Sequence, residues 1–226
     1  RAGMDNQPLI SNYLTMIPEE KLTGATSWRI MYDLFRDIEQ PCMKTVMNHR
    51  EDYAAKYTAD SIDNKIIGLY SNALMMKVQM VDTNGYNSII SKLKASKLDL
   101  ADKIVAFADL NRCKLKGQWD EYARLGVLFV DQYAKDDYRR LNDVAFNFSD
   151  HVNDRELLAK AEGWSRRAVE MMDTYRNNYT LGCLYYRSEK FADARKALNH
   201  AIELAAKSGT DAKQAQQLLG KIPQGK

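Results

Sequence analysis

Apolar residues recur three and four positions apart along most of this chain, the spacing that places them on one face of an α-helix. Before residue 135 the pattern predicts helices over residues 28–40, 46–57, 60–81, 86–95, 100–116 and 119–134. We find no convincing alternation with a period of two, which would mark a half-buried strand. The sequence therefore predicts an all-α protein of antiparallel helix pairs, with an irregular helical array over residues 27–134.

Turn-forming residues separate these helices. The first 26 residues are polar and contain two prolines, which predicts a linker or arm with one short helix near residues 9–16. Ser27 is the expected N-cap of the first long helix, because a serine oxygen can accept a hydrogen bond from an amide of the first turn. The run Asp82-Thr83-Asn84-Gly85 predicts a turn, and Gly117 predicts a break between two helices.

Residues 135–226 contain a repeated pattern of small and large side chains. An offset of 33 residues pairs similar positions in two copies: Phe148 with Leu181, Val152 with Tyr185, Ala161 with Ala194, Ala168 with Ala201, and Val169 with Ile202. Small side chains that face large ones let two helices approach closely. We therefore expect a duplicated helix pair, residues 142–174 and then 175 onward, with a capping helix over residues 211–222.

The second copy, with Leu181-Gly182, Tyr185, Ala194 and Ala201, resembles the tetratricopeptide repeat, a helix-turn-helix unit of roughly 34 residues. The resemblance implies a right-handed superhelix whose concave groove binds a peptide or a partner protein. In that repeat frame, the groove-facing residues of the last copy's first helix are Arg176, Tyr179, Cys183, Tyr186 and Arg187.

Two guanidinium groups beside two phenols suit a carboxylate or an acidic peptide. Arginine makes paired hydrogen bonds to carboxylates, and tyrosine offers apolar area with a polar tip. In the alternative interpretation, Tyr179 and Tyr186 pack against the neighbouring repeat and the arginines are solvated. The preceding copy offers Asp143, Phe146, Asp150 and Asn153 at the equivalent positions.

A longer stretch resembles the helical C-terminal half of a bacterial group of thioredoxin-like proteins that are exported to the cell envelope. The segments that carry this resemblance are residues 141–148, 154–168, 173–175, 184–186 and 201–205, with the Trp28 helix and residues 53–77 upstream. The resemblance implies a location in the cell envelope or periplasm and an upstream thioredoxin-like domain, of which this chain would be the C-terminal part. This chain lacks the CxxC dithiol of that domain, so no redox role passes to Cys42, Cys113 or Cys183.

Composition and charge exclude further classes of function. The chain has 33 basic and 30 acidic residues and a net charge of +3, a balance that does not call for a nucleic-acid partner. The sequence contains no apolar run long enough for a transmembrane helix. His49, His151 and His200 have no second His or Cys at helical ligand spacing, so we expect no metal site and no cofactor.

These observations favour a non-catalytic helical-repeat module that binds or scaffolds a protein or peptide. Two alternatives remain open at this stage. One is an enzyme whose site lies in a cleft between the helical halves, and the other is a purely structural dimerisation module. Both would leave the repeat pattern unchanged, because that pattern reports helix packing and not chemistry.

Overall fold

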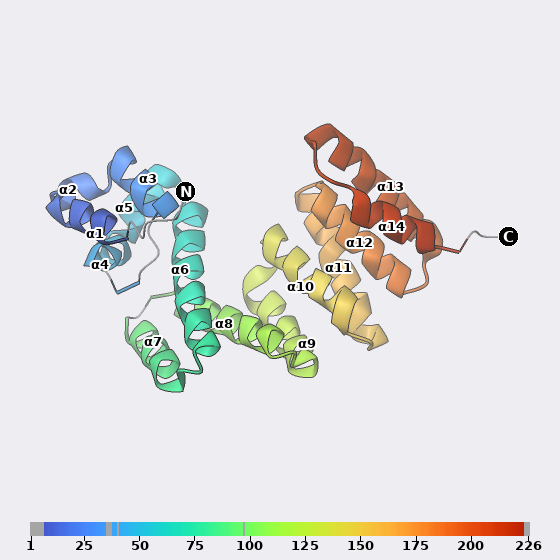
Figure 1. Cartoon of the computed structure of the whole chain (residues 1–226), viewed down its shortest axis with the longest axis horizontal. Coiled ribbons are helices and arrows are strands. Elements are labelled where there is room, and N and C mark those ends of the chain that lie inside the picture. Colours follow the sequence, from blue (N-terminus) through green and yellow to red (C-terminus); the bar gives the residue numbers. More distant parts are fainter. Residues whose placement is uncertain (1–6, 35–37, 40, 97, 224–226) are drawn as a thin grey trace. The chain divides into compact units, whose positions relative to one another are not determined.

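The computed structural model describes residues 7–34, 38–39, 41–96 and 98–223, and all regular structure within these ranges is helical (Figure 1). The predicted all-α class and the packing of adjacent helices are therefore confirmed, whereas the handedness of a superhelix stays a prediction. The chain divides into two compact units, and the boundary between them along the chain lies between Arg112 and Cys113. None of the helices in the described ranges is both long and apolar enough to span a membrane.

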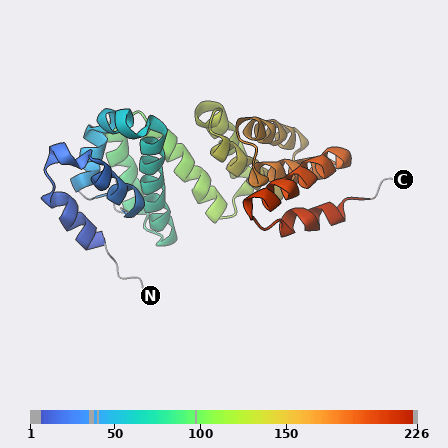
Figure 2. The ribbon, with the colours of Figure 1, turned by 90° about the horizontal axis from the view of Figure 1, so that it is seen from above.

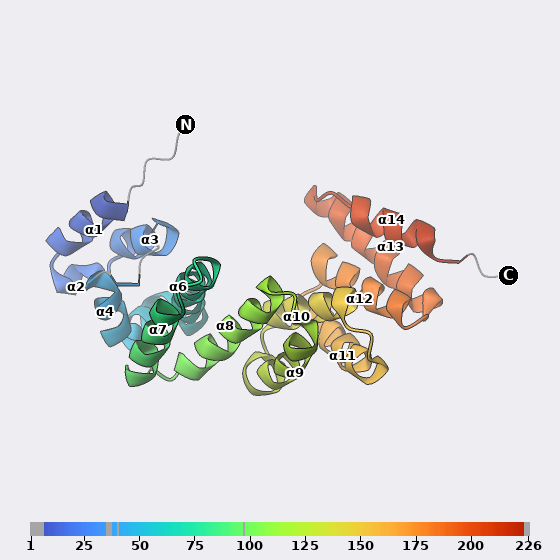
Figure 3. The same ribbon diagram turned by 60° about the horizontal axis from the view of Figure 1, so that its bottom comes forward.

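Unit 1 is built around one long helix. Its helices are α1 (Gln7–Met16), α2 (Glu19–Leu22), α3 (Ala25–Leu34), α4 (Pro41–Asn48), α5 (Arg50–Tyr57), α6 (Ala59–Gln79) and α7 (Thr83–Ala95), and α8 (Ala101–Leu115) begins in it. The helices before and after α6 both pack against it, and Figure 3 shows α7 beside α6. Ile62, Ile66 and Leu74 of α6 are fully buried, so this helix supplies the centre of the unit's core.

The N-terminal helices of unit 1 join this core. Trp28 of α3 stacks on Tyr57 of α5, with ring centroids 5.3 Å apart and an interplanar angle of 18°. Ile10, Leu14 and Leu22, from the segment expected to be a linker or arm, are buried in the same hydrophobic cluster. The predicted short helix is present as α1, and its buried side chains attach the segment to the rest of the unit.

Several helix starts differ from the sequence prediction, and the single helix predicted over residues 46–57 is instead two helices, α4 and α5. Ser27 lies inside α3, which begins at Ala25, and its Oγ donates to the backbone oxygen of Lys21 at 3.3 Å instead of capping a helix. The predicted turn at residues 82–85 is the first turn of α7. The Asp82 carboxylate caps that helix by accepting a hydrogen bond from the Gly85 amide at 2.8 Å. Aspartate and asparagine favour both turns and helix N-termini, so sequence alone does not separate the two.

Unit 2 is a series of helices that pack in chain order. It contains α9 (Trp119–Phe129), a π-helical turn (Val130–Ala134), α10 (Tyr138–His151), α11 (Arg155–Met171), α12 (Tyr175–Arg187), α13 (Phe191–Ser208) and α14 (Lys213–Lys221). Each helix from α10 to α13 packs against the next, α10 also contacts α12, and α14 packs against α13 (Figures 1 and 2). The sequence predicts residues 119–134 as part of the N-terminal array, whereas α9 and the π-helical turn belong to unit 2.

Side chains at the helix starts fix where the helices of unit 2 begin. The carboxylate of Asp137 accepts hydrogen bonds from two amides of the first turn of α10, and Asp154 does the same for α11. The Thr174 hydroxyl accepts from the Asn177 amide at the start of α12. Each cap satisfies backbone donors that have no partner inside the helix.

The small residues of the predicted repeat are buried where helices meet. Ala161, Ala168, Ala194 and Ala201 all have no exposed surface. At Gly182 a Cβ atom would lie 2.7 Å from two side-chain carbons of Leu198, which is closer than carbon atoms can pack. The absence of a side chain at Gly182 therefore allows the close approach of α12 to α13.

Candidate functional site

The predicted groove residues share one face of α12, and this face contacts α10. The Nη2 atom of Arg176 donates to Oδ1 of Asp143 at 2.6 Å, and the ring centroids of Phe146 and Tyr179 lie 6.3 Å apart. In both contacts the α10 residue is the one 33 positions earlier in the chain. Equivalent residues of the two repeat copies are therefore in contact with each other. We call this surface the α10/α12 face, defined by Asp143, Phe146, Asp150, Asn153, Arg176, Tyr179, Cys183, Tyr186 and Arg187.

Arg176 is the more accessible of the two candidate arginines. Its side chain is 69% exposed and forms an ion pair with Asp143, whose side chain is 36% exposed. A guanidinium group has five N–H donors, and the contact with Asp143 uses one of them. The remaining donors of Arg176 can therefore meet a second carboxylate.

Arg187 instead holds the end of α10. Its Nη1 donates to the backbone oxygen of Ser149 at 2.5 Å, and its Nη2 donates to the backbone oxygen of Val152 and to Oδ1 of Asn153, each at 2.8 Å. The last carbonyl groups of a helix have no partners inside it, and a cation there also meets the negative end of the helix dipole. The guanidinium of Arg187 thus acts as a C-terminal cap for α10.

Cys183 and Tyr179 form the interior of the face. Burial raises the pKa of the Cys183 thiol to about 12, so the thiol is protonated near neutral pH and is a poor nucleophile. Burial also raises the pKa of Tyr179, with a further contribution from the neighbouring Cys183. The Tyr179 ring stacks on Tyr175, with centroids 5.9 Å apart and an angle of 13° between the rings. These contacts fix the orientation of the Tyr179 ring.

Tyr179 and Tyr186 are half-buried, which leaves each phenol in contact both with the core and with solvent. Both pack against the small hydrophobic cluster of Ala194, Leu198 and Ala215, to which α14 contributes. The contact of Tyr179 with Phe146 is the packing that the alternative interpretation expects, and the exposed part of each phenol is open to a ligand. Asp150, the penultimate residue of α10, is exposed and lies near Tyr179.

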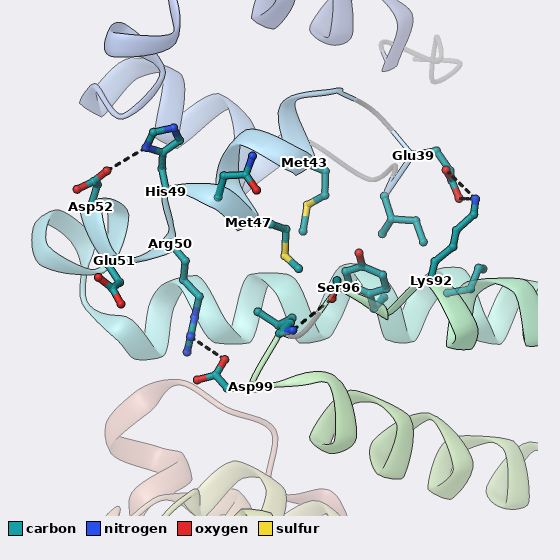
Figure 4. A pocket seen from close by; sticks show the side chains of 15 residues that line it. Glu39, Met43, Met47, His49, Arg50, Glu51, Asp52, Lys92, Ser96 and Asp99 are labelled. Atoms are coloured by element: carbon teal, nitrogen blue, oxygen red, sulfur yellow. Dashed lines mark hydrogen bonds and ion pairs between the residues drawn. The ribbon is translucent and has the colours of Figure 1, made fainter. Parts of the chain in front are cut away.

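A second candidate site lies within unit 1 and was not identified from the sequence. It is a cavity of about 900 Å³ (Figure 4). Met43 and Met47 lie in its middle. The apolar lining comes from three helices and two connecting segments: Ile38, Met43, Met47, Tyr70, Ile89 and Leu98. Charged side chains lie at its two ends: Glu39 and Lys92 at one, and His49, Arg50, Glu51, Asp52 and Asp99 at the other.

Among the described lining residues, the two permanently charged cations, Arg50 and Lys92, both form ion pairs. Nε of Arg50 donates to Asp63 at 2.7 Å, and its Nη1 donates to Asp99 at 2.8 Å. The hydrogen bond to Asp63 is the main reason that the pKa of Arg50 is raised. Nζ of Lys92 lies 3.1 Å from Oε1 of Glu39. Both cations are therefore neutralised within the protein.

Sequence reasoning missed this cavity for a specific reason. Its lining residues come from α4, α5, α6, α7 and the segments before α4 and after α7, so they are spread over residues 38–99 with no motif that joins them. The only signal was the many methionines, which fill irregular cores more often than they line binding sites. Met43 and Met47 lie in α4, and only the placement of the other helices shows that they line a cavity.

Each of the three histidines contacts a different residue near its own position in the fold. His49 contacts Asp52 at 3.0 Å, and His200 contacts Asp173 at 2.9 Å. His151 stacks on Trp119, with ring centroids 3.5 Å apart. Across the part of the chain that the structure describes, no three His, Cys, Asp or Glu side chains come together as metal ligands would. Cys42 lies in α4, and its side chain is outside the described residues.

Comparisons with protein-family models, with curated proteins and with solved structures found no match to this chain.

Proposed function

We propose that unit 2 is a non-catalytic helical-repeat module that binds a peptide or a segment of a partner protein on the α10/α12 face. The observation that carries this proposal is the pairing of equivalent residues, Asp143 with Arg176 and Phe146 with Tyr179, across two successive helices. Such pairing makes a surface that extends over more than one helix. An extended ligand can therefore contact it along several residues at once.

The resemblance to the tetratricopeptide repeat supports the same function. In that family, a rigid groove binds an extended or helical peptide, so the protein does not lose much entropy on binding. The further resemblance to exported thioredoxin-like proteins remains our hypothesis for the cellular context. It would place the protein in the cell envelope and make an upstream thioredoxin-like domain one of its partners.

From the contacts we infer different roles for four of the five groove residues. Arg176 and Tyr179 are placed to meet a ligand, because the guanidinium of Arg176 is exposed and the Tyr179 ring is held by its neighbours. Arg187 and Cys183 chiefly support the surface. A peptide carboxylate that joins Asp143 on the Arg176 guanidinium would give the preference for acidic ligands expected from the sequence.

Selection from a display library of short random peptides against the full chain tests the proposal. We expect enriched peptides to carry an acidic residue and to bind Arg176→Ala and Phe146→Ala roughly fivefold or more weakly, as truncation of a central interface residue does. Arg166→Ala is the matched control, since Arg166 is an exposed arginine of α11 outside the α10/α12 face. Equal binding to all three variants, or no enrichment at all, would overturn the proposal.

The two arginines provide an internal check on these roles. Arg187→Ala removes three hydrogen bonds from the end of α10, so we expect it to lower the free energy of unfolding by about 2 kcal/mol. Arg176→Ala breaks an exposed ion pair and should cost less than about 1 kcal/mol. Urea unfolding measures both. A stable Arg187→Ala protein that loses peptide binding would assign Arg187 to the ligand.

A further inference from the structure

The cavity of unit 1 has the features of a binding site for a small molecule, independently of the proposed function of unit 2. We propose that it binds an amphipathic organic cation, that is, an alkyl or aryl group that carries a protonated amine. The apolar middle of the cavity would hold the hydrocarbon part. The acidic end beside α5 would hold the amine (Figure 4).

The size and lining of the cavity suit the hydrocarbon part. A volume of about 900 Å³ is within the range of pockets that enclose drug-sized molecules. Met43 and Ile89 are buried, whereas Met47 and Tyr70 are half-buried and border the space. Methionine side chains are flexible and polarisable, so this lining can adapt to chains of different shape.

The charges decide between a cation and an anion. Among the described lining residues, the carboxylates are Glu39, Glu51, Asp52 and Asp99, and the permanently charged cations are Arg50 and Lys92. Both cations already contact carboxylates, as described above. An anionic ligand would therefore meet cations whose charge is already balanced, and the carboxylates that balance it would repel the ligand.

A protonated amine, in contrast, would meet carboxylates that are not already paired with a lysine or arginine of the described residues. Glu51 is exposed and has no ion pair within the described residues, and the contact that Asp52 makes is with His49. Figure 4 shows the side chains of Glu51 and Asp52 at the same end of the cavity as Arg50 and His49. The excess of acid is therefore concentrated at one end of an apolar space, which matches the polarity of an amphipathic amine.

The position of these acids in α5 demands a strict control. Glu51 and Asp52 occupy the first turn of α5, where negative charge stabilises any helix through its dipole. Asp60 occupies the first turn of α6 but does not line the cavity. Substitution of Asp60 therefore removes the same helix-stabilising charge without changing the proposed site.

The test uses three probes of equal chain length that differ in the charge of the head group: octylamine, octanol and octanoate. Isothermal titration calorimetry on the full chain should give the tightest binding for octylamine, by roughly fivefold over octanol, with octanoate weakest. This preference should shrink as the ionic strength rises from about 0.01 M to about 1 M, because exposed charges are screened. Equal affinities, tighter octanoate binding or no binding of octylamine would each overturn the proposal.

Variants then locate the site. In a Glu51→Gln, Asp52→Asn double variant, octylamine should bind about as weakly as octanol, whereas Asp60→Asn should retain the preference. Met47→Trp, which places a large side chain in the cavity, should weaken octylamine and octanol alike. If Asp60→Asn lowers octylamine affinity as much as the double variant does, or if Met47→Trp binds octylamine normally, the cavity is not the binding site.

Discussion

The two units of this protein show two ways in which helices can pack. In unit 2, α10 to α13 are of similar length, between 13 and 18 residues, and small residues let neighbouring helices approach closely. In unit 1, helix lengths run from four residues in α2 to 21 in α6. Helices of such different lengths cannot all pack along their whole surface, and the cavity lies between four of them.

Because their packing differs, the two units suit different kinds of ligand. Regular packing brings equivalent side chains of successive helices together, as at Phe146 and Tyr179, and produces a continuous outer face. Irregular packing leaves a hollow with a mixed apolar and charged lining. A continuous face suits an extended peptide, whereas a hollow suits a small molecule. The predictions below test whether the units are as distinct as their packing indicates.

The largest expected effect comes from removing a central side chain of unit 2. Phe148 is fully buried and contacts Tyr122 and Trp164, so Phe148→Ala should lower the stability of that unit by about 3–5 kcal/mol. Hydrogen exchange should then lose protection in α10 to α13 while α3 to α7 keep theirs, because local stability follows compact units. The matched variant in unit 1 is Ile66→Ala, which should give the opposite pattern.

An equal loss of protection throughout the chain in either variant would contradict this view. It would mean that the division between Arg112 and Cys113 separates contacts but not cooperative folding.

A smaller effect tests close packing between helices. Gly182→Ala places a Cβ atom 2.7 Å from Leu198 carbons, so we expect a loss of roughly 1–3 kcal/mol. Gly163, in the middle of α11, is the control, because an added Cβ would meet no atom within 4 Å. Gly163→Ala should stabilise the protein by about 0.5–1 kcal/mol, since alanine favours the helix. Urea unfolding checks the opposite signs, and destabilisation by both variants would show that Gly182 has no special packing role.

The repeat region could be predicted from sequence because its signals are local and repeated. Ala161 pairs with Ala194, and Ala168 pairs with Ala201, at the same offset of 33 residues. All four alanines are buried between helices. The N-terminal segment lacked such support. Its polar composition and prolines predicted a linker or arm with one short helix near residues 9–16. That helix is present as α1, and Ile10 and Leu14 on it pack into the core of unit 1, a contact that no repeated pattern in the sequence indicated.

The candidate sites show a similar limit. Helical spacing placed Arg176, Tyr179 and Arg187 on one face, as the structure has them, because a single helix fixes that relation. Spacing could not show that Arg187 caps α10, since that contact joins residues 34 or more positions apart. The cavity of unit 1 depends on contacts among four helices, and no local pattern encodes it.

The smallest expected effect is a pH-dependent one in unit 2. The pKa of Asp173 is lowered, first by its hydrogen bond with His200 and then by the one from Asn178. A lowered folded-state pKa means that the ionised carboxylate stabilises the fold at pH values above the unfolded pKa of about 3.9. This contribution is lost as the pH falls through the lower folded pKa. Because the Asp173 side chain is 50% exposed, the contribution should stay below about 1 kcal/mol.

The measurement is the difference in free energy of unfolding between the wild type and Asp173→Asn as a function of pH. The wild type should be the more stable protein above about pH 4, and the two should converge in more acidic solution, where the carboxylate is protonated in both the folded and the unfolded chain. His200→Gln should remove most of the same difference, because His200 is the largest cause of the lowered pKa. A difference that persists unchanged into acid would show that Asp173 acts through packing or through its neutral hydrogen bonds and not through its charge. The link between the start of α12 and α13 would then be as insensitive to pH as the apolar contacts around it.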